Sequence, residues 1–329
     1  MSVALTDSVE ALIQKITAQT ANIRLADEPA ELYDPIRYML SMGGKRIRPL
    51  LGALSYQMYH YDVEKFLPVL LALEVFHNFT LMHDDIMDNA SLRRGKPTVH
   101  QKWNTNIAIL SGDVMLVRAY DLLLHAPTDK LPRILQRFNA TATGVCEGQQ
   151  WDMNYETRES VSVEEYINMI QLKTAILLGF SLELGAILAD APEEDIALLY
   201  EFGVLIGIGF QLKDDLLDVY GDSQKFGKNI GGDIVSNKKT YLLILALQEA
   251  RGELLERLKY WLSVTDFDKE QKIKEVTQIY DALCIKQKTN LLIQSYFERA
   301  FSLLPCLSVS AEQYQTIESF TKMLIDRDM

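Results

Sequence analysis

The last part of the chain lacks the residues that interrupt helices. After Gly252, about 75 residues run to the C-terminus with no glycine and a single proline, Pro305. Strands joined by tight turns need glycine and proline at those turns, so this stretch is expected to be helical. Its final segment shows the helical period directly, because apolar residues recur at three- and four-residue steps with charged residues between them: Tyr314, Ile317, Phe320, Met323 and Leu324.

The rest of the chain carries similar periods, and alternating runs of strand length are scarce. We therefore predict an all-α protein. The segment that begins after Ser162 also has a helix-starting signal, an N-cap hydroxyl followed by two acidic residues. No linker rich in proline, serine or glycine divides the chain, and no repeat is visible, so a single domain over residues 1–329 is expected. The periodic segments are 5–25, 30–42, 65–89, 106–125, 130–155, 162–189, 193–220 and 238–263.

One loop interrupts this helical pattern. Seven of the 17 glycines fall between Gly203 and Gly232, and the sequence GDSQKFGKNIGGDIVSNKKT is the one long stretch without a helical period. Long loops in compact domains tend to be functional. We expect this loop to contribute to a binding site.

Charge and cysteine content exclude several classes of protein. Lysine and arginine number 33 against 45 acidic residues, a formal charge of −12, which is the wrong sign for holding nucleic acid through its phosphates. Three scattered cysteines make neither a disulfide framework nor a zinc site, which favours a reducing cytoplasmic setting. The N-terminus has acidic residues where a secretory signal would be basic and then apolar. The most apolar windows contain Glu183 and Glu201, so no transmembrane segment is predicted.

Two copies of the pattern DDxxD, DDIMD and DDLLD, each lie in a strongly apolar segment. Aspartates four residues apart project from one face of a helix. A single copy could be a solvated helix end, but two copies are hard to attribute to chance. If they faced each other in a bundle, they would form an acidic pocket in which Mg²⁺ holds a diphosphate. The six aspartates are Asp84, Asp85, Asp88, Asp214, Asp215 and Asp218.

Two basic clusters lie near the first acidic motif. The segment GGKRIRP, residues 43–49, joins two glycines to three cations, which suits a phosphate group bound without metal. The alternative for this segment is a helix C-cap followed by solvated basic residues. The second cluster, Arg93-Arg94-Gly95-Lys96-Pro97, follows DDIMD directly. In a chain of negative net charge, such local clusters indicate anion binding.

Together these motifs resemble the trans-isoprenyl diphosphate synthase (polyprenyl synthetase) family. GGKRIRP, DDIMD with RRGKP, and FQLKDDLLD with FGKNIGGD and NKKT follow in the order and at the spacing of that family. The resemblance runs from about residue 35 to the end of the chain. It implies one synthase domain, a bundle of long helices around a central cavity, and a homodimer. It also implies that isopentenyl diphosphate condenses with allylic diphosphates of five, ten or fifteen carbons.

The resemblance assigns a role to each matching residue. The first three aspartates would bind two Mg²⁺ ions and Asp214 a third, with Asp215 and Asp218 behind it. Asp233 would orient Lys228 or the third ion. The cations that would neutralise the allylic diphosphate are Arg93, Lys173, Lys228 and Lys238. The residues that would hold isopentenyl diphosphate are Gly44, Lys45, Arg48, His77 and Arg94. Thr174 and Gln211 would line the pocket beside the allylic carbocation that forms when the diphosphate departs.

Product length is expected to depend on the helix that carries the first motif. Phe79 lies five residues before Asp84, about 7.5 Å along a helix, and its neighbour Thr80 is small. By resemblance this pattern favours a geranylgeranyl (C20) product over farnesyl (C15). Phe79 could also be ordinary core packing. His83 is expected to be structural.

Two other functions remain alternatives. A class I terpene synthase also uses an aspartate-rich motif with Mg²⁺, but it would lack GGKRIRP and normally the second DDxxD. A non-catalytic subunit of a heteromeric synthase usually loses aspartates from one motif, and all six are present here. A helical scaffold protein would need neither acidic motif.

Overall fold

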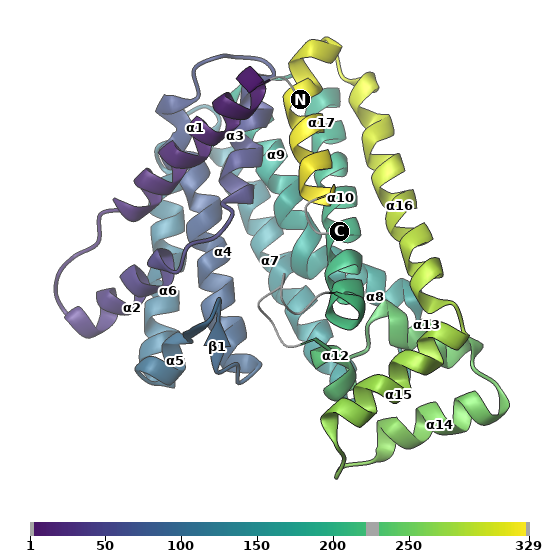
Figure 1. Ribbon diagram of the computed structural model, residues 1–329. Helices are drawn as coiled ribbons and strands as arrows, with labels where there is room; N and C mark the ends of the chain where they lie inside the picture. The colour runs from purple at the N-terminus through teal and green to yellow at the C-terminus, as the bar shows by residue number, and fades with distance from the viewer. Residues whose placement is uncertain (1–2, 222–229, 327–329) are drawn as a thin grey trace. The chain divides into compact units, whose positions relative to one another are not determined.

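The computed structural model describes residues 3–221 and 230–326, and within them the chain is helical apart from one small hairpin (Figure 1). The prediction of an all-α protein is confirmed. The long helices are α1 (Val3–Ala21), α2 (Ala30–Ser41), α3 (Ile47–Gln57), α4 (Leu67–Met87), α6 (Thr105–Leu123), α7 (Leu131–Thr157), α8 (Val163–Ile170), α9 (Ile176–Leu188), α10 (Glu193–Tyr220), α13 (Tyr241–Glu249), α14 (Gly252–Ser263), α15 (Lys269–Ala282), α16 (Ile285–Leu303) and α17 (Ala311–Asp326).

Short elements join these helices. The hairpin pairs β1 (Leu92–Arg93) with β2 (Lys96–Pro97) in antiparallel register. A π-helical turn, η2 (Gln171–Ala175), connects α8 to α9. The remaining short helices are η1 (Glu64–Phe66), α5 (Val99–Lys102), α12 (Gly232–Val235) and η3 (Leu304–Cys306).

The chain forms two compact units, which are described separately. The first unit comprises residues 1–139, 180–200 and 304–329. Within it α4 and α6 run side by side (Figure 1). Aromatic rings of this unit make an apolar layer in which Phe76 meets Phe138 at 5.1 Å and Phe138 meets Phe180 at 6.1 Å between ring centres. Such edge-to-face and tilted pairs are the arrangements that buried aromatic rings prefer.

The second unit comprises residues 140–179 and 201–303. The later part of α10 packs against α16, where Phe210 lies 5.8 Å from Phe297 between ring centres. The helix α8 begins with a complete capping box, since Ser162 accepts from the Glu165 amide and the Glu165 side chain accepts from the Ser162 amide. The N-cap predicted at Ser162 is therefore confirmed.

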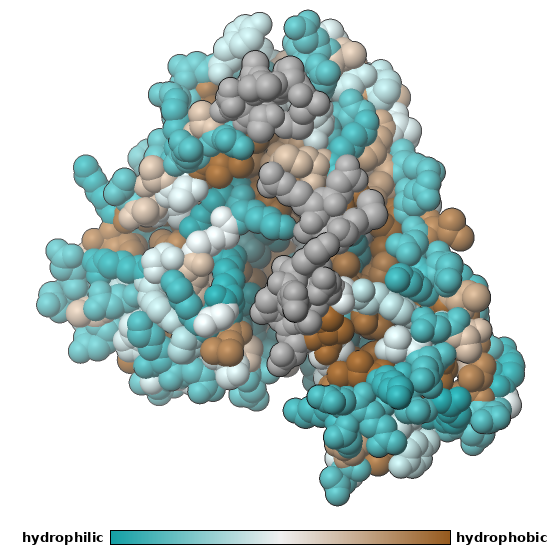
Figure 2. Space-filling model, viewed as in Figure 1, coloured by the Kyte–Doolittle hydropathy of each residue, from teal (hydrophilic) through white to brown (hydrophobic). Residues whose placement is uncertain are grey.

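Polar residues cover most of the face drawn in Figure 2, and apolar residues show through only in patches. The longest apolar helices are mostly buried in the core. Three helical stretches are long and apolar enough to cross a membrane: 64–87, 163–188 and 193–220. Of their most apolar windows, 72%, 78% and 67% are buried inside the protein. A helix that is apolar on all sides can serve as a core helix, so these stretches are explained without a membrane.

The structure differs from the predicted segments in several places, and one is the loop predicted to lack helix, in which residues 232–235 form the short helix α12. The stretch 238–263 is two helices, because Ala250 is extended (ψ 138°) and Gly252 has φ 54°, which together end α13 and start α14. The helix α3 begins inside the basic motif, where we predicted only a turn. The hairpin β1–β2 was not predicted, since its strands are too short to show an alternating pattern.

Candidate active site

The first acidic motif lies at the C-terminal end of α4. The backbone N–H of Asp88 donates to the carbonyl of Asp84 at 2.8 Å, so the helical turn extends through both residues and their side chains share one face. Asp84 is half-buried, Asp85 is 2% exposed and Asp88 is exposed. The C-terminal end of a helix carries partial negative charge, which disfavours carboxylates there. Three carboxylates at this position create a strong local demand for cations.

Arg93 already meets part of that demand. Its Nε donates to Asp85 Oδ2 and its Nη2 to Asp85 Oδ1, each at 2.8 Å. Both Asp85 oxygens are thus engaged by one guanidinium, while the side chains of Asp84 and Asp88 are more exposed to solvent than that of Asp85. Among the residues that the structure describes, no three histidine, cysteine or acidic side chains gather closely enough to hold a metal by themselves.

Arg93 ends strand β1 and Arg94 begins the turn of the hairpin, so the two side chains contact different partners. Arg94 and Gly95 both have positive φ, 52° and 74°, which is the backbone of a two-residue hairpin turn. The Arg94 side chain reaches the GGKRIRP segment, where Nη1 donates to the carbonyl of Gly43. A Cβ on Gly44 would stand 3.0 Å from the Arg94 guanidinium nitrogens, and the φ of Gly44 is 137°, a backbone that residues with a side chain rarely adopt, so glycine suits this position. The two predicted basic clusters therefore meet.

His77, on α4, lies among the cations of this meeting point. Burial lowers the pKa of His77 well below its ordinary value, and the charges of four arginines lower it further: Arg48, Arg94, Arg93 and Arg46. A neutral imidazole among guanidinium groups is the expected response to crowded positive charge. Of the residues predicted to hold isopentenyl diphosphate, Gly44, Arg48, His77 and Arg94 are thus brought together, and Lys45 is exposed in the same loop.

Arg48 is a half-buried cation with a hydrogen-bond donor that is unsatisfied within the described residues. Burial lowers the pKa of Arg48 to about 10, the charge of Arg94 lowers it as well, and Glu74 alone opposes them. Its Nε is buried and makes no hydrogen bond within the described parts of the chain. A buried donor without a partner calls for an explanation, and an anion held at this point supplies one.

Glu74 and Arg46 form a buried ion pair that the sequence analysis missed. Arg46 Nη1 donates to Glu74 Oε1, and each side chain is 3% exposed. Arg46 Nη2 also donates to the carbonyl of Leu40 at 2.8 Å, and Asn78 Nδ2 donates to Glu74 Oε1 at 3.0 Å. The signal in the sequence is a single acid inside the apolar run LLALEVF. This pair anchors the segment that carries Lys45 and Arg48.

Phe79 and Thr80 lie on α4 before the aspartates, as expected, and both are half-buried. The ring of Phe79 contacts His83 at 4.8 Å and Phe76 at 5.7 Å between centres, which joins it to the aromatic layer. Thr80 Oγ1 donates to the carbonyl of His77 at 2.8 Å. His83 Nε2 lies 3.2 Å from the carbonyl of Ile109 on α6, a contact that fits the structural role predicted for it.

The second acidic motif occupies the end of α10 in the second unit. Asp214 is exposed, whereas Asp215 is 4% exposed. The Tyr166 hydroxyl donates to Asp215 Oδ2, and Gln211 Nε2 donates to Asp215 Oδ1 at 3.0 Å. Burial raises the pKa of Asp215 to about 6 against the opposing charge of Lys238. Asp214 is thus the outward carboxylate and Asp215 the inner one.

Asp218 and Asp233 connect α10 to the short helix α12. Asp218 Oδ2 accepts from the backbone N–H of Asp233 at 2.9 Å. Burial raises the pKa of Asp233 to about 7, with Lys238 lowering it and Asp215 and Asp218 raising it further. Lys238 therefore lies close enough to influence both acids. Lys228 falls within residues 222–229, outside the described part of the chain.

Lys173 and Thr174 lie in the π-helical turn η2, an irregularity that often marks functional sites. Lys173 Nζ pairs with Asp152 Oδ2 on α7 at 2.6 Å, a partner that the sequence analysis missed. A Cβ on Gly148 would stand 2.2 Å from the backbone nitrogen of Lys173, so glycine is required where the turn meets α7. Thr174 Oγ1 donates to Gln211 Oε1 at 3.1 Å, which brings these two predicted pocket residues into contact.

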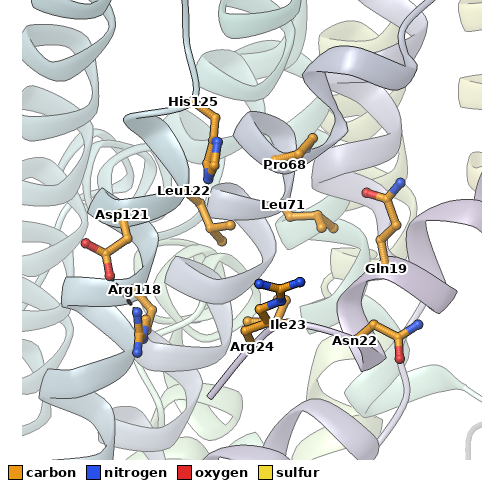
Figure 3. Close-up of a pocket in the computed structure, with 10 residues that line it drawn as sticks. All are labelled: Gln19, Asn22, Ile23, Arg24, Pro68, Leu71, Arg118, Asp121, Leu122 and His125. Atoms are coloured by element: carbon orange, nitrogen blue, oxygen red, sulfur yellow. Dashed lines mark hydrogen bonds and ion pairs between the residues drawn. The ribbon is translucent and has the colours of Figure 1, made fainter. Parts of the chain in front are cut away.

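A groove of about 470 Å³ in the first unit lies away from all of these residues. Ten residues from α1, α4, α6 and the segments after α1 and α6 line it, among them Arg24, Leu71 and His125 (Figure 3). Arg118 and Asp121, also drawn there, form an ion pair at 2.8 Å. None of the predicted site residues contributes to this groove.

The chain is similar in sequence and in structure to known prenyl diphosphate synthases. Residues 29–280 match the family model described as Polyprenyl synthetase. The chain is 35% identical over 303 residues to the geranylgeranyl pyrophosphate synthase of Geoglobus acetivorans, covering 92% of each protein. It is 39% identical over 269 residues to the short chain isoprenyl diphosphate synthase of Methanocaldococcus jannaschii, covering 82% of this chain and 81% of that protein. A crystal structure of a geranylgeranyl pyrophosphate synthase is 41% identical, with a TM-score of 0.91 over 98% of this chain and 99% of that one.

Proposed function

The chain belongs to the polyprenyl synthetase family and is a prenyltransferase that lengthens prenyl diphosphates; on this premise we propose that it is a Mg²⁺-dependent geranylgeranyl diphosphate synthase. It joins isopentenyl diphosphate head-to-tail to allylic diphosphates of five, ten and fifteen carbons and releases diphosphate. Farnesyl diphosphate is the alternative product, since relatives with that activity also match the chain.

One observation carries the proposal: adjacent arginines of the hairpin contact two different clusters, one acidic and one basic. Arg93 contacts the carboxylate Asp85, at the acidic site, and Arg94 contacts the Gly43 carbonyl, at the cationic site around His77. The reaction needs two diphosphates bound close together but differently, one at the acidic site and one without metal. A hairpin that aims one guanidinium at each site supports this division of substrates.

The donor set fits Mg²⁺. The ion prefers oxygen ligands, keeps several waters and takes one or two carboxylates together with substrate phosphates. Asp84 and Asp88 provide such carboxylates at the end of α4, and Asp214 provides an exposed one on α10. Bound there, two or three ions would neutralise charge on the departing diphosphate. Asp215 and Asp218, which are engaged by hydrogen bonds, would support Asp214 rather than bind directly.

The chain's own residues account for the remaining steps. Arg93, Lys173 and Lys238 hold the allylic diphosphate and stabilise the charge that grows on it as it leaves. Thr174 and Gln211 present oxygens to the allylic cation without capturing it, provided that water is excluded. The cationic site around His77 holds isopentenyl diphosphate so that its double bond attacks the cation. The proton lost afterwards passes to the released diphosphate, so no protein nucleophile is required.

A turnover assay tests this function. The purified protein is incubated with isopentenyl diphosphate, Mg²⁺ and each of the C5, C10 and C15 allylic diphosphates, and the products are sized by chromatography. We expect geranylgeranyl diphosphate from all three primers and none with EDTA. Products ending at C15 would favour the farnesyl alternative. Hydrocarbons formed without isopentenyl diphosphate would favour a terpene synthase, and no turnover alone would favour a non-catalytic subunit.

We also propose that the protein is a homodimer. Three apolar residues of α6 and its end, Leu110, Val117 and Leu124, are 57%, 59% and 59% exposed and recur every seven residues. Residues at that spacing form one stripe along a helix, which suits packing against a second copy. The pair Leu110→Glu and Val117→Glu should convert the dimer to a monomer in light scattering. A wild-type monomer would contradict the proposal.

A cytoplasmic location is the remaining part of the proposal. All three cysteines lie in described residues and none forms a disulfide. Cysteines that form no disulfide are typical of proteins in a reducing compartment. Fractionation of cells that produce the protein, followed by immunodetection, tests the location directly.

A further inference from the structure

A buried lysine that the chemistry above does not use lies beneath the segment that carries Lys238. Lys272, on α15, is 1% exposed. Its Nζ donates to Asn237 Oδ1 at 2.7 Å and to the carbonyl of Val235 at 3.3 Å, and it lies 4.3 Å from the centre of the Phe267 ring. Burial lowers the pKa of Lys272, and no charged group in the described residues counters that effect.

A charge in such surroundings needs an explanation. Burying an ammonium without a counter-ion is unfavourable, and an apolar side chain of similar length would fill the same space without that cost. Both acceptors of the Lys272 ammonium lie within residues 235–237, directly before Lys238. The charged Lys272 side chain therefore joins α15 to a single short segment, residues 235–237, through two hydrogen bonds.

Asn237 links the position of Lys272 to that of Lys238. Its backbone is left-handed, with φ 56°, and its side chain is fixed at both ends, because Oδ1 accepts from Lys272 and Nδ2 donates to the carbonyl of Leu262 at 3.1 Å. The next backbone N–H, that of Lys238, donates to the carbonyl of Asp233 at 2.9 Å. The turn at Asn237 thus sets the direction in which Lys238 leaves the chain.

The other side of the segment is held from α10. Asp218 accepts from the backbone N–H of Asp233, so α12 and the turn after it lie between an acceptor on α10 and a donor on α15. We propose that Lys272 is a positioning residue, which acts through Asn237 to place the Lys238 ammonium for the allylic diphosphate. The inference rests on the proposed function in so far as Lys238 binds that diphosphate.

The test is a double-mutant cycle between Lys272→Met and Lys238→Ala. Binding of inorganic diphosphate in the presence of Mg²⁺ is measured by calorimetry, and KM values for the allylic primer and for isopentenyl diphosphate are measured by turnover. Lys272→Met should weaken diphosphate binding and raise KM for the primer about tenfold, with KM for isopentenyl diphosphate unchanged. In the Lys238→Ala background it should have no further effect. Lys272→Arg should recover part of the loss, and Lys274→Met, at an exposed position of α15, should behave as wild type.

A second variant keeps the test decisive if Lys272→Met does not fold. Asn237→Gly retains the left-handed backbone but removes both side-chain contacts, and it should give the same primer-specific loss. Losses that add to that of Lys238→Ala, or that affect both substrates equally, would overturn the positioning role. Diphosphate binding in a wild-type protein that turns over no primer would instead overturn the proposed function, and the calorimetric cycle would still decide the role of Lys272.

Discussion

Glu74→Gln replaces one carboxylate oxygen of a side chain buried in α4 by an amide nitrogen and so removes its negative charge. We expect this change to lower the free energy of unfolding by about 3–5 kcal/mol. The side chains of Glu74 and Arg46 are each 3% exposed, so water cannot replace the lost partner. Two unit charges about 4 Å apart attract each other by about 4 kcal/mol at an effective dielectric constant of 20, which agrees with that range. The change leaves Arg46 charged and buried without a counter-ion, although its hydrogen bond to the Leu40 carbonyl remains.

The same pair should contribute much less when it is removed as a whole. Burying both charges is itself unfavourable, so Arg46→Met combined with Glu74→Leu should be closer to wild type in stability than Glu74→Gln alone. Urea denaturation followed by circular dichroism at neutral pH measures all three proteins. A loss below about 1 kcal/mol for Glu74→Gln, or a double variant less stable than the single one, would refute the reasoning.

The same stability measurement with inorganic diphosphate added tests the anion site. Glu74 is the acid that offsets the crowded positive charge at Arg48 and Arg94. Without it, inorganic diphosphate should bind the variant more tightly and therefore stabilise it more than the wild type, by about 1.4 kcal/mol for each tenfold gain in affinity at saturating diphosphate. Equal stabilisation of the two proteins would indicate that diphosphate binds away from these arginines.

Other changes test the remaining parts of the site. Asp84→Ala should lower kcat by at least about 100-fold, because the carboxylate supports charge that develops on the leaving group; EDTA should abolish turnover of the wild type and Mg²⁺ restore it, and activity that survives EDTA would exclude the metal site. Lys45→Ala should weaken isopentenyl diphosphate by about 1.5–3 kcal/mol and the primer less, as separate KM measurements would show; equal weakening would contradict the assignment. Phe79→Ala should lengthen the product by at least one isoprene unit, and because the ring is only half-buried it should cost about 2 kcal/mol in stability; an active variant with unchanged products would place the chain stop elsewhere. The lowered pKa of His77 means that the unfolded chain takes up a proton there first, so stability should fall as pH drops below about 6.5; a His77→Gln variant with an unchanged drop between pH 7 and 5.5 would show that another group is responsible.

The helices could be predicted because their signal is local. Period and capping residues revealed α7, α10 and the C-terminal helices, and the N-cap predicted at Ser162 is confirmed. The boundary at Ala250 was missed because apolar residues continue in step across it. The helix α3 was missed because its first residues, including Arg48 and Pro49, were interpreted as part of a basic turn.

The candidate site could be predicted only where residues form a motif. The two DDxxD patterns and the basic clusters are visible as short strings, but their partners are distant in sequence. Glu74 pairs with a residue 28 positions away, Asp152 with one 21 away and Tyr166 with one 49 away. No local pattern marks such partners, because the fold alone brings them together. A lone acid within an apolar run, as at Glu74, is the one trace that sequence leaves.

The π-helical turn at Gln171–Ala175 makes the site depend on the number of residues as well as on their identity. A π turn holds one residue more than an α turn, so the chain is one residue out of step with an ordinary helix at this point. Deleting a single residue there would leave an ordinary α-helix whose two ends keep nearly the same rotation, because the π turn absorbs its extra residue locally. Tyr166 could then still meet Asp215, but the widened turn that brings Thr174 to Gln211 would be lost. No substitution removes or restores this turn, so insertions and deletions in this segment should be far more damaging to the Thr174 contact than replacements.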